Sequence, residues 1–309
     1  MFTQFYASPQ YVNPAWAGRT ESPTIYLNFR NQWPAISQAY ISYAASYDQY
    51  FKGIHGGVGL IILSDRAGNG IYQSNALYGS YAYNAELSDR FAIKAGLQIG
   101  LVQKSLDFSK IFFLDQIDPV TGYYDAGNQP NPTAESTNIL PSALYVDFSA
   151  GLLAYSNLIY GGISVKHLTR PEENFSGSQL TRLPIRYIAQ FGAKLPLTGS
   201  NGNVTLSPNI LYTQQFLFKQ INGGFSFKFN KLFAGAWFRH NFSNPDALIF
   251  LTGIEYGIFR TAYTYDLTLS NLQGFSGGAH EISIILNIDK LSGTGKSNAA
   301  DYLQCPEMF

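Results

Sequence analysis

Many stretches of the chain alternate apolar and polar residues with a period of two, and none has the roughly 18 consecutive apolar residues of a membrane-spanning helix. In the clearest stretch, apolar side chains occupy the odd positions Phe91, Ile93, Ala95, Leu97, Ile99 and Leu101. The even positions carry Ala92, Lys94, Gly96, Gln98 and Gly100. Successive side chains of a β-strand point to opposite faces, so one face here suits lipid and the other tolerates water. This pattern is typical of a transmembrane β-barrel.

Alternation and turn residues together predict about 14 strands along the whole chain. Single-chain bacterial barrels have an even number of strands, and the first and last strands share the same pattern, so they can close one sheet. We therefore expect an all-β fold, a transmembrane antiparallel up-and-down β-barrel with short irregular N- and C-terminal segments. The predicted strands are 24–33, 38–51, 54–64, 71–84, 90–105, 143–155, 158–168, 185–196, 203–213, 216–229, 231–241, 247–257, 259–269 and 279–290.

The connections between these strands alternate in length. The even-numbered connections are short, at 51–54, 155–158, 229–231 and 257–259. The odd-numbered ones are mostly long, at 64–71, 106–142, 169–184 and 270–278. Outer-membrane barrels have short periplasmic turns and longer outer loops, so we expect the N-terminus on the periplasmic side. The exception is the break near Gln214 and Gln215, where the pattern needs an outer loop and almost none is visible.

A barrel of this size is too wide for side chains alone to fill. Fourteen strands spaced roughly 4.8 Å apart and tilted roughly 40° enclose a cylinder on the order of 28 Å across, so the lumen is water-filled or plugged. Charged residues such as Lys94 and Asp147 fall on the inward register, which keeps them out of lipid. We divide the chain into an N-terminal irregular segment that is periplasmic or a lumenal plug, a transmembrane barrel, and a C-terminal periplasmic tail, at residues 1–23, 24–290 and 291–309.

Composition favours a membrane barrel over a soluble protein. Aromatic residues make up 16% of the chain and charged residues only 13%, whereas about 25% of residues in soluble domains are charged. A soluble β-sandwich of this length would ordinarily divide into domains, and no linker is visible.

The formal net charge is zero without a basic run, which argues against nucleic-acid binding. No signal peptide is visible after Met1, so we take the chain as mature or trimmed, and a single cysteine, Cys305, excludes an intrachain disulfide.

The chemical motifs do not support an enzyme. Residues 274–278 match the G-x-S-x-G nucleophile pattern, but they lie in a predicted hairpin loop without the helix that this motif requires. His280 and Glu281 are adjacent in a strand and point to opposite faces, which makes them poor catalytic partners. The histidines lack metal-ligand spacing, and segments 65–70 and 115–125 do not follow the EF-hand order. We expect no catalytic residue, metal or cofactor, and a barrel hydrolase that uses Ser276 or His280 is only a third hypothesis.

Several local strings occur together in the order found in one known family. They are residues 4–9 (QFYASP), 13–18 (NPAWAG), 30–33 (RNQW), 55–60 (HGGVGL) with Asp65 and Gly68, 263–266 (YTYD), 280–283 (HEIS) and 305–309 (CPEMF). On these strings the chain resembles the PorP/SprF family of Bacteroidetes outer-membrane proteins over nearly its whole length. The last string departs from the family's cysteine-proline-x-phenylalanine ending by one extra residue before Phe309.

The resemblance implies a non-enzymatic barrel, integral to the bacterial outer membrane, that is associated with the type IX secretion system and gliding motility. Family members are typically encoded beside a large secreted adhesin or another cargo with a type B C-terminal domain, which they help to secrete or to hold at the cell surface. Others are linked to the periplasmic ring. The partners implied are a secreted cargo protein, other secretion components, a periplasmic peptidoglycan-binding protein and outer-membrane lipid.

Two groups of residues are candidates for binding. The 106–142 loop has more apolar residues than a solvent loop needs, and such patches often mark partner sites, although the loop could also pack on itself over the barrel mouth. Its candidates are Ile111, Phe112, Phe113, Leu114, Tyr123 and Tyr124. The polar candidates, lumenal or carried by the family strings, are Arg30, Gln32, Asp65, Asp266, His280 and Glu281. Among them Arg30, Asp266 and Glu281 fall on inward registers, which predicts a charge network near the barrel seam that holds an end segment or a cargo strand.

The leading hypothesis is a docking barrel whose outer loops, and its lumen, bind the C-terminal domain of one secreted protein. The alternatives are a diffusion porin or solute channel, and a barrel that links the outer membrane to the periplasmic secretion ring. Stable single-channel conductance would favour the porin, whereas a plugged docking barrel should conduct little.

Overall fold

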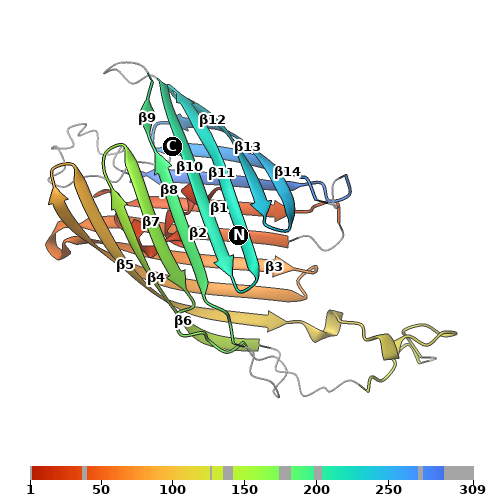
Figure 1. The fold of residues 1–309 in the computed structure, drawn as a ribbon. Coiled ribbons are helices and arrows are strands. Elements are labelled where there is room, and N and C mark those ends of the chain that lie inside the picture. The colour runs from red at the N-terminus through yellow and green to blue at the C-terminus, as the bar shows by residue number, and fades with distance from the viewer. Residues whose placement is uncertain are drawn as a thin grey trace.

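The structure is a computed structural model that describes residues 2–36, 40–125, 127–134, 142–173, 182–197, 204–270 and 274–288 (Figure 1). The strands are β1 (Thr24–Gln32), β2 (Tyr40–Phe51), β3 (Gly56–Ala67), β4 (Tyr72–Ser88), β5 (Phe91–Leu106), β6 (Ser142–Tyr155), β7 (Ile159–Lys166), β8 (Arg186–Ala193), β9 (Leu195–Pro196), β10 (Val204–Gln215), β11 (Phe218–Phe229), β12 (Leu232–Asn241), β13 (Asn244–Tyr256), β14 (Phe259–Thr268) and β15 (Ala279–Asn287). The helices are η1 (Phe5–Ala7), α1 (Pro9–Val12), η2 (Pro14–Trp16), η3 (Lys52–Ile54), η4 (Phe108–Lys110) and η5 (Leu114–Gln116). No helix in these ranges is long and apolar enough to cross a membrane.

Fourteen of the strands close into an antiparallel barrel. Neighbours in sequence pair around the sheet, and β15 returns to pair with β1 from Thr24 opposite Asn287 to Gln32 opposite Ala279. β10 pairs with both β8 and β11, and β9 is an extra two-residue strand at one end of β10. The predicted barrel of about 14 strands, closed by its first and last strands, is confirmed. Closure matters in lipid because every backbone N–H and C=O must find its partner within the protein.

Several strand boundaries differ from the prediction, among them those of β8 and β3. The strand predicted at 185–196 breaks after β8, where the Lys194 N–H donates to the Leu158 carbonyl. β3 continues through residues 64–67, so the long connection predicted at 64–71 is a turn of residues 68–71.

The near absence of a loop at Gln214 and Gln215 is a real feature of the barrel. β10 and β11 pair as far as Gln215 opposite Phe218, and only residues 216–217 join them. A tight hairpin turn therefore stands where the alternating pattern requires an outer loop.

The two ends of the barrel differ. One end carries the turns at 52–55, 156–158, 230–231 and 257–258, and we call it the short-turn end. The opposite end carries residues 107–134, and we call it the long-loop end. In Figure 1 these residues extend away from the barrel beyond β5, and they do not cross its mouth.

The wall has an apolar outer face and a polar inner face. On β5, Leu97 is 66% exposed on the outside, whereas Lys94 and Gln98 on the inside are 2% and 3% exposed. Exposed apolar side chains recur around the barrel, and contact with lipid tails removes such a band from water. The outer face therefore fits a membrane interior.

The N-terminal segment lies inside the barrel (Figure 1). Two of its three short helices, α1 and η2, begin at Pro9 and Pro14, whose fixed φ suits the first helical position. Asn13 caps η2 by accepting the Ala15 N–H. Trp16 is buried and packs edge-on against the ring of Tyr160 on β7. Residues of this segment thus take up lumenal space that wall side chains alone do not fill.

Candidate functional site

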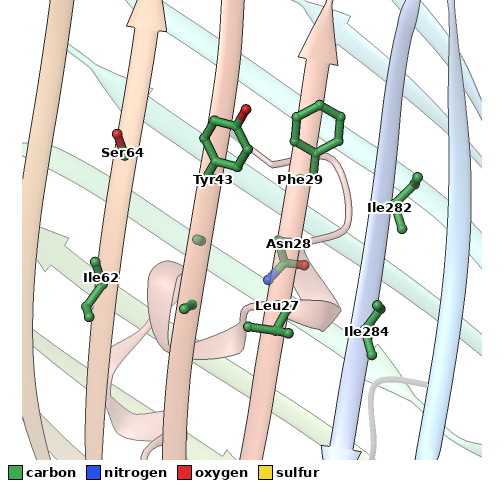
Figure 2. Close-up of a pocket in the computed structure, with 10 residues that line it drawn as sticks. Leu27, Asn28, Phe29, Tyr43, Ile62, Ser64, Ile282 and Ile284 are labelled. Atoms are coloured by element: carbon green, nitrogen blue, oxygen red, sulfur yellow. The ribbon is translucent and has the colours of Figure 1, made fainter.

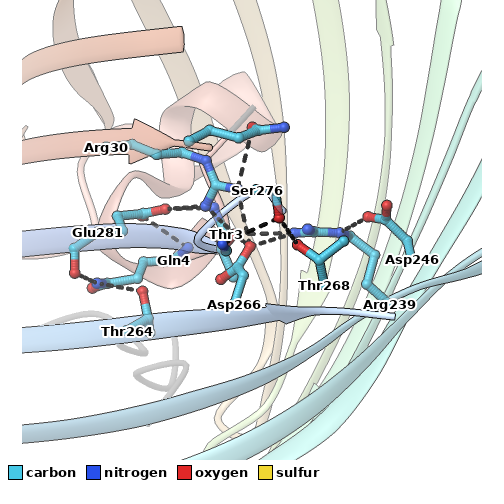
Figure 3. Close-up of polar contacts among 12 residues, drawn as sticks. Thr3, Gln4, Arg30, Arg239, Asp246, Thr264, Asp266, Thr268, Ser276 and Glu281 are labelled. Carbon is cyan, nitrogen blue, oxygen red and sulfur yellow. Dashed lines mark hydrogen bonds and ion pairs between the residues drawn. The ribbon is translucent and has the colours of Figure 1, made fainter. Parts of the chain in front are cut away.

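Four charged side chains meet on the inner face where the first strand pairs with the last, and we call them the seam cluster: Arg30, Arg239, Asp266 and Glu281 (Figure 3). Arg30 Nη1 lies 3.1 Å from Glu281 Oε2, and Arg30 Nη2 lies 2.9 Å from Asp266 Oδ2. Arg239 Nη1 lies 2.9 Å from the same Asp266 oxygen. Each charge has a partner of opposite sign, which is the condition for burying ionised groups this deeply.

The seam cluster holds the start of the N-terminal segment. The two oxygens of the Glu281 carboxylate accept the backbone N–H groups of Thr3, at 2.7 Å, and Gln4, at 2.9 Å. The Thr3 hydroxyl donates to Asp266 Oδ2 at 2.8 Å and accepts from Arg239 Nη1 at 3.1 Å. Two successive main-chain amides converge on one carboxylate just before η1, and such a turned backbone forms charge-assisted bonds to an anion. The cluster therefore binds the start of the N-terminal segment and also joins the first strand to the last.

Glycines on the inner wall make room for the middle of the segment. At four of them a Cβ would collide with the segment, so its backbone and side chains approach the wall as closely as only glycine allows. The glycines and the atoms that a Cβ would strike are Gly57 with Gly18 Cα, Gly59 with Gln10 Oε1, Gly96 with Ala15 N, and Gly151 with Asn13 Oδ1.

Polar side chains also anchor the segment along its length. Asn13 Nδ2 donates to the carbonyl oxygens of Leu152 on β6, at 3.0 Å, and Ile163 on β7, at 3.1 Å. Lys94 Nζ donates to the carbonyls of residues 17 and 18 at 2.6 and 2.8 Å. These bonds reach the neighbouring strands β5, β6 and β7, and the seam cluster holds the segment on the opposite side of the barrel.

The structure brings four of the six polar candidates together. Arg30, Asp266 and Glu281 form most of the seam cluster, and Gln32 Oε1 accepts a bond from Arg30 Nη2 at 3.4 Å. Asp65 lies apart, on β3, two strands away from Arg30.

His280 does not line the lumen, so it stays a candidate only as a member of the family string 280–283. It alternates with Glu281 along β15 and points outward, since one strand cannot turn two successive side chains to the same face. Its Nδ1 lies 2.7 Å from the Tyr263 hydroxyl, and its ring centroid lies 5.2 Å from that of Tyr265.

Sequence reasoning missed the partners that the N-terminal segment and β12 contribute. Arg239 falls on the inward register of its strand, but its partner Asp266 is 27 positions away. Thr3 and Gln4 carry no local signal, because their bonds to Glu281 span more than 270 positions. The string 13–18 stood out only as a family string and as an irregular proline-containing segment.

Residues 107–134 form a loop that is braced by its own hydrogen bonds. Gln116 Nε2 donates to the Asn131 carbonyl at 2.7 Å, and Asn131 Nδ2 donates back to the Gln116 carbonyl at 2.8 Å. Asp118 Oδ1 accepts the N–H groups of the two residues at 120 and 121, at 2.7 and 2.8 Å. Part of the loop is therefore ordered by internal bonds.

The loop exposes three of its six candidate side chains. Phe112 is 62% exposed, Leu114 89% and Tyr124 49%, whereas Ile111, Phe113 and Tyr123 are half-buried. The rings of Phe112 and Tyr123 lie edge-on at 4.6 Å, and those of Tyr123 and Tyr124 at 4.9 Å. The three aromatic rings form one connected patch.

The serine of the G-x-S-x-G string is not arranged for catalysis. Ser276 is 1% exposed, and its hydroxyl donates to Thr268 Oγ1 at 3.2 Å (Figure 3). His280 lies on the outer face, so it cannot serve as the base of this serine. Within the described ranges, no group of three or more His, Cys, Asp or Glu residues is placed to hold a metal ion.

A groove of about 370 Å³ lies on the outer wall over β15, β1, β2 and β3 (Figure 2). Its floor includes Ala45, and its rim is apolar: Leu27, Phe29, Tyr43, Ile62, Ile282 and Ile284. These side chains belong to the lipid-facing register, so the groove offers mainly apolar contact, with Asn28 and Ser64 as the other polar residues of its lining besides Tyr43.

Comparisons with known proteins agree with this architecture. The family model described as type IX secretion system membrane protein PorP/SprF matches residues 1–286. No curated protein sequence matches the chain. Among solved structures, the chain is similar to the toluene transporter TodX of P. putida, with a TM-score of 0.50, 9% identity and coverage of 89% of this chain and 92% of that one. A FadL homologue of Pseudomonas aeruginosa gives a TM-score of 0.48 and 10% identity, and the alignment covers 91% of this chain and 94% of that one. At such identity the likeness shows the fold alone.

Proposed function

Since the chain belongs to the PorP/SprF family of type IX secretion system membrane proteins, we propose that this outer-membrane barrel supports the secretion or cell-surface anchoring of one cargo protein. The cargo would be an adhesin-like protein with a type B C-terminal domain. The long-loop end faces outward in this proposal, and the short-turn end faces the periplasm, following the usual asymmetry of loop lengths.

The observation that carries the proposal is the braced loop at 107–134. A monomeric surface rarely leaves a connected aromatic patch in water unless another molecule covers it. Because internal bonds already order part of the loop, binding costs less conformational entropy than binding by a disordered segment. The docking residues proposed are Ile111, Phe112, Phe113, Leu114, Tyr123 and Tyr124.

The filled lumen favours docking over free diffusion. A porin needs an open aqueous path, whereas residues 2–19 here are clamped across the barrel by the seam cluster, the wall glycines, Asn13 and Lys94. We also propose that the barrel is non-enzymatic, which the geometry of Ser276 and His280 supports.

The test is purification of the tagged protein from native outer membranes in mild detergent, with mass spectrometry of the proteins that co-purify. A large surface protein in near-equal amount supports the proposal and identifies the cargo. Recovery of ring or peptidoglycan-binding proteins alone would move the role to the periplasmic machinery.

Deletion of residues 111–124 should abolish cargo retention while the barrel still assembles, as judged by its heat-modifiable migration on gels. Leu217→Ala is the matched control, because Leu217 is 81% exposed on the short β10–β11 turn at the same end. Unchanged retention after the deletion would exclude the loop as the docking site.

A further inference from the structure

Two cations face each other on the inner wall at the long-loop end, on the opposite side of the barrel from the seam cluster. Lys166 is the last residue of β7 and Arg186 is the first residue of β8, and the antiparallel pairing places them directly opposite each other. Both share the inward register of the buried residues Ser164 and Ile188. Like charges directly opposite each other on one face of a sheet are unfavourable. We call Lys166 and Arg186 the rim cations.

Lys166 is a buried cation without a hydrogen-bond acceptor among the described residues. It is only 7% exposed, and its Nζ lies 4.7 Å from the ring centroid of Tyr11 in the N-terminal segment. An ammonium group has three N–H donors, and burying it without an oxygen to accept from them is unfavourable. The contact with the ring face offsets part of this cost and leaves the donors unused.

Arg186 is held in place by uncharged groups. Its Nε and Nη2 donate to Gln215 Oε1 at 3.0 and 2.8 Å, and Gln215 Nε2 donates to the Pro184 carbonyl at 3.0 Å. The guanidinium also bonds the Tyr11 hydroxyl. A guanidinium has five N–H donors, more than these contacts use. The contacts therefore orient Arg186 without supplying a negative charge.

One carboxylate, that of Asp147 on β6, stands close to the rim cations. Asp147 and Arg186 are the charged groups near enough to Lys166 to act on it. Asp147 is 1% exposed, and its Oδ2 lies 2.9 Å from His167 Nδ1, whereas its Oδ1 has no hydrogen-bond partner in the described part of the chain. The His167 side chain reaches Asp147 because its left-handed backbone, with φ 59°, interrupts the alternation that would turn it outward.

The described residues leave one positive charge at this site. Two cations face one carboxylate, with the histidine counted as neutral. Glu173, another acidic residue near the long-loop end, is already paired with Lys104, and Asp65 on β3 acts on Tyr11 but not on Lys166. The segments outside the described residues include 135–141, 174–181 and the predicted C-terminal tail at 291–309.

We propose that the rim cations form a binding site for a carboxylate group at the long-loop end of the lumen. The Cβ atoms of directly opposite strand residues lie roughly 4.5–5.5 Å apart, so Lys166 and Arg186 can both donate to one carboxylate. A carboxylate carries a single negative charge, which equals the positive excess, whereas a phosphate monoester carries about 1.5 to 2 at neutral pH.

The bound carboxylate would lie against the N-terminal segment, since both rim cations contact Tyr11. It would thereby join this segment to β7 and β8. If the long-loop end faces outward, as in the proposed function, the ligand enters from the cell exterior.

Trifluoroacetate is a suitable probe, because it combines one carboxylate with a fluorine signal that the protein lacks. In fluorine NMR titrations of the purified full-length protein in detergent, we expect the trifluoroacetate line to broaden and an excess of acetate to reverse the broadening. Lys166→Gln should raise the dissociation constant about tenfold, as expected for the loss of one hydrogen bond between charged groups. Lys166 has no described hydrogen bond to lose, so this variant should retain its heat-modifiable migration.

Two further variants and a control complete the test. Arg186→Gln should weaken binding as well, and Arg186→Lys, which keeps the charge, should weaken it less. Lys219→Gln is the matched control, because Lys219 is an exposed cation near the start of β11, at the same end of the barrel, and its loss should leave binding unchanged. Equal dissociation constants for the wild type, Lys166→Gln and Arg186→Gln would overturn the proposal.

Competitors identify the kind of molecule that supplies the carboxylate. N-acetylglycylglycine has the carboxylate of a peptide chain end, and acetate is a small free acid. Stronger competition by the peptide would assign the site to a chain end, and equal competition would assign it to small acids. The C-terminal amide of the peptide should not compete, and competition by the amide would contradict recognition of a carboxylate. The experiment contains no cargo, so a negative result here is separate from a failure of the proposed function.

Discussion

Arg30 and Glu281 lie directly opposite each other on the first and last strands, and their side chains meet at 3.1 Å on the inner face of the barrel. The contact joins residues 251 positions apart at the place where the barrel closes. Glu281 also binds the amides of Thr3 and Gln4. Seam closure and anchoring of the N-terminal segment therefore depend on the same carboxylate.

Removing one member of the seam cluster should be strongly destabilising. Arg30→Ala leaves Glu281 buried without its cation, whereas Asp266 keeps Arg239, and loss of one partner of a buried ion pair costs about 3–5 kcal/mol. The urea midpoint of the detergent-solubilised barrel, followed by tryptophan fluorescence, measures this change. His280→Ala is the control, because His280 lies on the outer face of the same strand pair and should change stability little. Equal midpoints for the two variants would contradict the role assigned to the cluster.

A methyl group added at a wall glycine should disturb the packing of the N-terminal segment against the barrel wall. Gly59→Ala would place its Cβ against Gln10, and overpacking of this kind costs roughly 1–3 kcal/mol. Gly79→Ala is matched to it, since a Cβ there meets nothing within 4 Å. We expect a lower thermal midpoint for Gly59→Ala only; the same loss at Gly79 would point to backbone propensity and not to the contact with the segment.

The N-terminal segment should control conductance. Full-length protein in planar lipid bilayers should give little stable current, because residues 2–19 occupy the lumen. Deletion of residues 2–19 should open a steady conductance, provided that the shortened barrel retains its heat-modifiable migration. Large stable channels from the full-length protein would instead favour the diffusion porin.

The outer loop should lose order in acid. The Thr121 and Val120 N–H groups hold the pKa of Asp118 below its usual range, and the Ala134 N–H does the same for the pKa of Asp115. A carboxylate whose folded-state pKa is lowered stabilises the folded loop above its unfolded pKa, and this contribution is lost as the pH falls through the lowered value. Limited proteolysis within 107–134 should therefore be slow at pH 7 and faster near pH 3.

Asp118→Asn separates charge from hydrogen bonding in this loop. Both N–H groups bind the same oxygen, Oδ1, which asparagine retains as a neutral amide oxygen. The variant should keep the loop order at pH 7 and show a smaller change in proteolysis on acidification. A pH profile identical to that of the wild type would assign the acid sensitivity to other groups.

Much of the wall could be read from short stretches of sequence. Period-two alternation over about ten residues places Leu97 outside and Lys94 inside, because each strand residue must take the opposite face from its neighbours. The same rule assigns Arg30, Asp266 and Glu281 to the inner face. It also places His280 on the outer face, since its neighbour Glu281 points inward.

The sequence by itself determined the membrane barrel, because lipid contact, backbone pairing and side-chain alternation act between neighbouring residues and repeat along every strand. Only the tertiary structure decided what occupies the lumen. Asn13 reaches carbonyls 139 and 150 positions away, and Glu281 reaches Thr3 across 278 positions. Such contacts form only after the barrel closes around the segment, so no local pattern along the chain encodes which wall residues meet it.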